Sequence, residues 1–180
     1  MLFENPGLLT PSTAASDSID NVVVRSGTTI TVSAGSDNKS NGSLEVEGTL
    51  DLTTTTGHTF TTITGGGDIR LGADNFPTGD ASDFTTAGLG EGRVIFEGTS
   101  TINFAGATGT TFYNFEVDMS GQTFVLLNDL TVNGDLTVTA GTFQINDATA
   151  AVQRTVTVEQ NVTVLAAGAI TVGTLSLIHI

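Results

Sequence analysis

The chain contains no cysteine and no tryptophan, and its 180 residues include only three prolines. Without cysteine, disulfides and thiolate metal sites are excluded. Basic residues are also scarce, because five lysines and arginines stand against 19 acidic residues and give a net charge of -14. This charge would repel a phosphate backbone or an anionic membrane surface, so we expect no nucleic-acid binding. No apolar run reaches the roughly 18 residues of a membrane-spanning helix, so we expect no membrane insertion.

Threonine and glycine dominate what is present, with 33 and 22 residues. Threonine is β-branched and suits the half-buried surface of a sheet, while glycine provides the backbone angles of tight turns. Long amphipathic stretches of alanine, leucine, glutamate and lysine are missing. The composition therefore predicts an all-β fold built from many short strands.

Three segments share one pattern, in which two apolar-x-apolar strands flank a polar corner of three residues. They are Leu44–Leu52, Leu130–Val138 and Val156–Val164. The second and third copies lie 26 residues apart (156 − 130), and an internal period of this size indicates a repeat architecture. Because the apolar residues of each copy keep the same parity, both of its strands can face one interior.

Two architectures fit this pattern. The pair Asn133-Gly134 is a strong hairpin signal, and hairpins could pack into a sandwich. Alternatively, the corner turns the chain through part of a circle, and successive coils stack about 4.8 Å apart as parallel sheets. A hairpin of three-residue strands buries little apolar surface. We therefore expect a right-handed parallel β-helix (β-solenoid) with coils of about 20 to 26 residues.

The phenylalanines Phe96, Phe104 and Phe112 follow one another at intervals of eight residues. Aromatic side chains from neighbouring coils could stack inside the solenoid at this spacing. Ordinary core positions on three separate strands explain the spacing equally well.

Composition divides the chain into four parts. Residues 1–18 are an irregular lead-in, and residues 19–174 are a β-helix repeat domain with an inserted loop at 72–92. The end, residues 175–180, reads L-S-L-I-H-I and breaks the pattern of polar turns. It is either a non-native tail, since it resembles a translated sequencing-adapter sequence, or one last apolar strand.

Several segments resemble repeats of large extracellular adhesin-like proteins of Bacteroidota-type bacteria. They are G-R-V-I-F-E-G-T-S-T-I-N-F-A-G, T-T-F-Y-N-F-E-V and L-L-N-D-L-T-V-N-G-D-L-T-V-T-A-G-T-F-Q-I-N. The resemblance extends over residues 20–174 and implies a parallel β-helix at the cell surface or outside the cell. Members of that family carry an export signal and a C-terminal sorting domain. Neither is found in this sequence, so we expect a fragment of a longer chain.

Residues suited to catalysis are few. His58 is expected at a corner or on a polar face, His179 lies in the suspect tail, and no G-x-S-x-G nucleophile motif occurs. A polysaccharide lyase on a β-helix would need a basic residue close to acids, and Arg70 and Arg93 are the candidates. We expect no catalytic residues and no enzyme, with a polysaccharide-binding or polysaccharide-degrading β-helix as the alternative.

The loop at 72–92 is the one candidate metal site. Its Asp74, Asp80 and Asp83 offer hard oxygen ligands of the kind that Ca²⁺ prefers, although their spacing is not that of an EF-hand. The alternative is a solvated loop in which these side chains cap backbone groups. No other cofactor is expected.

Threonines occupy equivalent outward positions in the second and third copies of the pattern. The pairs are Thr131 with Thr157 and Thr137 with Thr163. Flat threonine arrays are used by ice-binding solenoids, but the first copy has Glu45 and Asp51 at these positions and interrupts the array. We therefore expect a non-catalytic structural or adhesive segment of an extracellular or bacterial cell-surface protein. Its expected partners are glycans, other surface ligands and neighbouring repeats.

Overall fold

The structure, a computed structural model, describes most of the chain as short strands. The described residues are 2–3, 7–9, 22–32, 43–54, 58–80, 82–85, 91–105, 111–145, 154–172 and 177–179. Within these ranges the only helix is the four-residue α1 (Ser82–Thr85). No helix in the described part of the chain has the length and apolar character needed to cross a membrane.

The strands form three sheets, here called A, B and C. Sheet A contains β1 (Leu2–Phe3), β3 (Val22–Val24), β5 (Ser43–Val46), β7 (Thr59–Thr64) and β9 (Thr78–Asp80). Sheet B contains β2 (Gly7–Leu9), β4 (Thr29–Val32), β6 (Thr49–Leu52), β8 (Asp68–Leu71), β10 (Arg93–Phe96), β13 (Asn114–Leu126), β15 (Leu136–Ile145) and β17 (Val162–Val172), with β11 (Ile102–Phe104) paired to β13. Sheet C contains β12 (Thr111–Phe112), β14 (Leu130–Val132), β16 (Thr155–Val158) and β18 (Leu177–His179).

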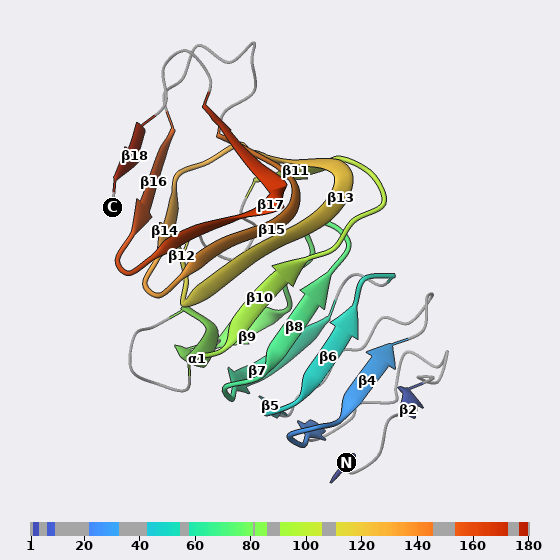
Figure 1. The fold of residues 1–180 in the computed structure, drawn as a ribbon. Helices are drawn as coiled ribbons and strands as arrows, with labels where there is room; N and C mark the ends of the chain where they lie inside the picture. The colour runs from blue at the N-terminus through green and yellow to red at the C-terminus, as the bar shows by residue number, and fades with distance from the viewer. Residues whose placement is uncertain are drawn as a thin grey trace.

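Every strand pairing among the described residues is parallel, which confirms the expected all-β parallel solenoid and rules out the hairpin alternative. Paired residues in sheet B are offset by 19 positions at the tightest point, where Thr49 faces Asp68, and by 26 where Leu136 faces Val162. The strands of sheet B therefore follow one another along the solenoid, and the two chain ends lie at opposite ends of it (Figure 1). The right-handed sense of the coil remains a prediction.

The segment Leu130–Val138 contains L-T-V twice, and its two L-T-V strands form two walls of one coil, as predicted. β14 carries its first copy in sheet C and β15 its second copy in sheet B, with the corner 133–135 between them. The next coil stacks in register, since Leu130 faces Val156 and Leu136 faces Val162. Leu130 and Leu136 are each 1% exposed, so both walls contribute to one shared interior.

The interior contains a continuous cluster of phenylalanine rings. The rings of Phe96 and Phe104 are 5.4 Å apart between centroids and meet edge-on, and those of Phe104 and Phe112 are 5.9 Å apart and tilted. The three residues lie on the separate strands β10, β11 and β12, so the eight-residue spacing reflects core positions on three strands. Phe115 and Phe124 join the same cluster at 5.4 Å from each other. Offset and edge-on contacts at these distances are favourable for aromatic rings.

The long strands β13, β15 and β17 bend in their middle and so form two sides of a coil (Figure 1). At this bend, the register between β13 and β15 shifts around Asp118, and the register between β15 and β17 shifts after Val138. Such bulges increase the local twist and turn a strand. Gly121 and Gly141 have positive φ values of 71° and 83° there, which glycine adopts without strain.

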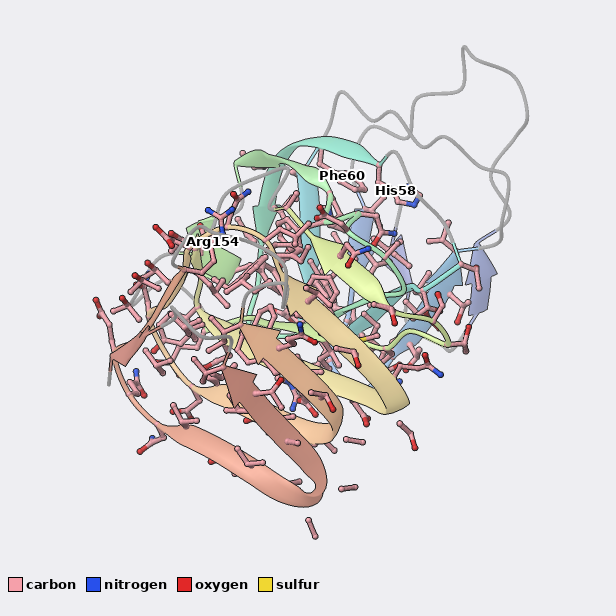
Figure 2. The ribbon with its side chains drawn as sticks, turned by 90° about the horizontal axis from the view of Figure 1, so that it is seen from above. His58, Phe60 and Arg154 are labelled. Atoms are coloured by element: carbon pink, nitrogen blue, oxygen red, sulfur yellow. The ribbon has the colours of Figure 1, made fainter. Side chains whose placement is uncertain are left out.

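Two further sequence expectations concern segments before β10. The segment 72–92, expected as an inserted loop, contains regular structure, because β9 pairs with β7 and α1 contacts β7 and β12. His58 was expected at a corner or on a polar face, as a surface residue, and the expected exposure was wrong. Its side chain is only 3% exposed and lies beside the buried Phe60, at the start of β7 (Figure 2). The surrounding threonines indicated a polar surface, but they say nothing about which way the residue before a strand points.

Candidate functional site

The outward face of sheet B carries most of the charged side chains that contact one another. On each strand, the side chains that alternate with the buried ones point outward. Because neighbouring strands are paired in register, these side chains form one outward row across sheet B. In order, the row is Thr31, Asp51, Arg70, Ile95, Glu116, Thr137 and Thr163. The row beside it brings Asp68 next to Arg93. Acidic and basic residues that are 19 or more positions apart in the sequence are thus neighbours.

Arg93 is the centre of a network that connects four strands. Its Nε and Nη2 donate to the two carboxylate oxygens of Asp68, each at 2.9 Å, and its Nη1 donates to Glu116 Oε2 at 2.7 Å. The second oxygen of Glu116 accepts a hydrogen bond of 2.7 Å from the hydroxyl of Thr139. Bidentate arginine–carboxylate pairs are strong and directional. The network therefore fastens β8, β10, β13 and β15 together on the outside, while apolar rows hold them inside.

The pKa of Arg93 is raised above its ordinary value, chiefly by the hydrogen bond to Asp68. The charges of Asp68 and Glu116 raise it further, and partial burial of the guanidinium opposes them. Arg93 therefore holds its proton more firmly than a free arginine. Its arrangement suits an ion-pair clamp.

A second ion pair lies farther along the same face, next to a shallow pocket. Arg70 Nη1 donates to Glu97 Oε2 at 3.3 Å. The pocket has a volume of about 230 Å³ and is lined by Thr53, Thr54, Gly72, Glu97, Gly98 and Thr99. Nearby, Asp51 accepts hydrogen bonds from the backbone NH and the hydroxyl of Thr53, at 3.0 and 2.7 Å.

Glu97 is the titratable group of this pocket, and its pKa is raised. Burial is the main cause, and the charges of Asp118, Asp51 and Glu116 add to it, while Arg70 opposes them. The pocket thus offers hydroxyl groups and one carboxyl group to a small polar molecule. No aromatic ring lines it.

Comparison with known proteins finds no match. No family model, no curated protein and no solved structure matches the chain. The resemblance to adhesin-like repeats therefore stands on the quoted segments alone, and the parallel solenoid is the part of it that the structure supports.

Of the three aspartates proposed for calcium, only Asp74 has a described side chain. Asp74 Oδ2 accepts a hydrogen bond of 2.9 Å from the backbone NH of Ala105, which is the capping role given as the alternative. The side chains of Asp80 and Asp83 lie outside the described residues, although their backbones belong to β9 and α1. Among the described side chains, no group of three acids or histidines could hold a metal ion. The calcium site remains a prediction.

The predicted threonine ladders exist but are short. In sheet C the ladder contains Thr111, Thr131 and Thr157, and in sheet B it contains Thr137 and Thr163. Glu116 follows directly in sheet B and ends the ladder.

The arginine clamps could not be found from the sequence. Arg70 and Arg93 were singled out as the basic residues next to an acidic loop, but their partners lie on strands of neighbouring coils. The other basic residues are placed differently: Arg25 lies 3.8 Å from Glu47 on an exposed corner, Arg154 lies elsewhere on the solenoid (Figure 2), and Lys39 is outside the described residues. The offset between partner residues in sheet B varies from 19 to 27 residues, so counting along the chain does not identify the partners.

Proposed function

We propose that this chain is a rigid structural or adhesive segment of a secreted or cell-surface bacterial protein, and that it acts as a mechanical spacer. The observation that carries the proposal is an apolar row that runs without interruption from β4 to β17 in sheet B. It consists of Ile30, Leu50, Ile69, Val94, Phe115, Leu136 and Val162. Its first six members are each at most 2% exposed.

The physical basis of such a spacer is the nearest-neighbour character of a solenoid. Each coil contacts only the coils before and after it, so stability is added coil by coil along the axis. The outer ion pairs centred on Arg93 strengthen the same contacts from outside. The resemblance to adhesin-like repeats and the net charge of -14 support a location outside the cell.

A polysaccharide lyase is the alternative, since it would need a basic residue close to acids. Arg93 does meet Asp68 and Glu116, but a catalytic base must give up its proton before it can accept another. The raised pKa of Arg93 works against this role. We therefore favour the spacer.

Pulling the chain by its two ends in a force microscope tests the spacer function. We expect stepwise unravelling, in which each coil of 19 to 27 residues releases about 7 to 10 nm of extended chain. As the matched control, Thr131→Cys with Thr157→Cys would lock one 26-residue coil by a disulfide, because these residues are direct partners in sheet C. Locking should remove about 9 nm from the total, and reductant should restore it. Unravelling of the whole chain in one step would contradict the expectation that the coils unfold one at a time.

A further inference from the structure

The C-terminal end of sheet B leaves apolar side chains uncovered. Within the described residues, all the exposed large apolar side chains lie on β17, and they are Val164, Leu165 and Val172 at 45%, 47% and 47% exposure. Among the described residues, β17 is the last strand of its sheet and pairs only with β15. The uncovered side chains are therefore concentrated at one sheet edge.

Comparison of β17 with β15 shows what is missing at this edge. Val138 of β15 faces Val164 of β17, and Ile145 faces Val172. Val138 and Ile145 are 0% exposed because β17 lies over them, whereas their partners in the same two rows are almost half exposed. The difference is what one additional strand would bury.

The neighbouring sheet C shows how many strands the uncovered edge of β17 lacks. In sheet C, β16 is already followed by β18, while in sheet B nothing follows β17 among the described residues. The edge is therefore stepped, and the space on β17 is one strand deep. A second solenoid end of the same shape would meet β18 before its own β17 reached this edge.

The edge also lacks the usual protection against strand addition. Natural edge strands are shielded by charged residues or proline. β17 reads V-T-V-L-A-A-G-A-I-T-V and has neither, in a chain with 24 charged residues (5 + 19). An added strand would meet unpaired backbone groups along β17 and an apolar, uncharged row of side chains.

We propose that the free edge of β17 is a docking site for one extended, uncharged strand that carries the repeat pattern of this solenoid. The strand adds in parallel, as all other strands do, and places apolar side chains over Val164, Ile170 and Val172. It carries a small residue at the bend, where Gly168 already faces Gly141. Main-chain hydrogen bonds supply affinity and the alternate apolar side chains supply specificity. The inference rests on the proposed spacer function, because it describes how such a segment would join the next repeat.

A synthetic peptide with the sequence of residues 133–146, labelled with a fluorophore, is the probe. It contains the whole of β15 with its polar corner, N-G-D-L-T-V-T-A-G-T-F-Q-I-N. We expect saturable one-to-one binding to the 180-residue chain by fluorescence anisotropy, at concentrations where the peptide alone is monomeric. Val164→Lys should weaken binding at least tenfold, because it places a charge in the row that the strand covers. Thr137→Lys is the matched control, since it adds the same charge on the outward side of β15, one strand in from the edge, and should leave binding unchanged.

Three results would overturn the proposal: absence of saturable binding, equal weakening by both variants, or a dimer of the chain alone that Val164→Lys dissolves. The last would mean that a second copy occupies the edge, and light scattering without peptide detects it. Circular dichroism of both variants checks that the fold is retained. Failure to capture the peptide with stepwise unravelling intact would reject the docking site alone. Capture without stepwise unravelling would reject the spacer function alone.

Discussion

Replacing Phe115 by alanine is expected to lower the free energy of unfolding by about 3 to 5 kcal/mol, the range for a large aromatic side chain lost from a packed core. Phe115 is 0% exposed, and its ring lies between 5.4 and 5.9 Å from the rings of four neighbours. These are Phe96, Phe112, Phe124 and Phe143. The four come from different strands, so the cavity would open between coils where the walls cannot close in.

Denaturation by urea, followed by far-ultraviolet circular dichroism, measures this loss. Phe76→Ala is the matched control, because Phe76 is 6% exposed and has one described ring contact, with Phe112 at 5.4 Å. We expect it to cost clearly less than Phe115→Ala, since each aromatic contact contributes about 0.5 to 1.5 kcal/mol beyond the buried area. Equal losses in the two variants would show that the ring cluster is not a centre of stability.

Gly141→Ala is expected to have the second large effect, because the bend of β15 has no room for a side chain. A Cβ atom there would overlap the carbonyl oxygen of Met119 on the coil below and lie 2.8 Å from that of Gln122. Both obstacles are backbone atoms, which cannot rotate away. The backbone at Gly141 also has φ of 83°, where an L-residue costs roughly 1 to 2 kcal/mol.

Gly121→Ala separates the backbone strain from the steric clash of the added Cβ atom. Gly121 has a similar φ of 71°, but a Cβ atom there would meet nothing within 4 Å. It should therefore show the backbone strain alone. Overpacking adds about 1 to 3 kcal/mol in Gly141→Ala, so its thermal midpoint should fall well below that of Gly121→Ala. Identical midpoints would mean that the coils at this bend are not packed as closely as the structure has them.

Much of the fold could be predicted because the spacing of apolar residues in the repeated segments shows which side chains face the interior. The L-T-V pairs of β14 and β15 have apolar residues at constant parity, and the copy 26 residues on fixes which strands stack. The bends inside β13 and β15 could not be predicted in the same way. They depend on where a glycine meets the backbone of another coil, and no local pattern records that contact.

The candidate site was predicted less well, for a related reason. Asp68, Arg93 and Glu116 look unrelated in the sequence, at separations of 25 and 23 residues, and become neighbours only through register. Irregular coil lengths hide that register. Asp74, by contrast, was recognised as a residue able to cap backbone groups, and it does so at Ala105.

Cross-linking of introduced cysteines tests the stacked coil most directly, because the chain has no thiols of its own. In the solenoid, Thr131 is the direct partner of Thr157 on the next coil, about 4.8 Å away across parallel strands. In a hairpin with the three-residue loop 133–135, Thr131 would instead face Thr137. The solenoid predicts that a short thiol cross-linker joins Thr131→Cys to Thr157→Cys within one molecule, and that it leaves Thr131→Cys with Thr137→Cys unjoined. Efficient cross-linking of the second pair, with none in the first, would contradict the parallel solenoid.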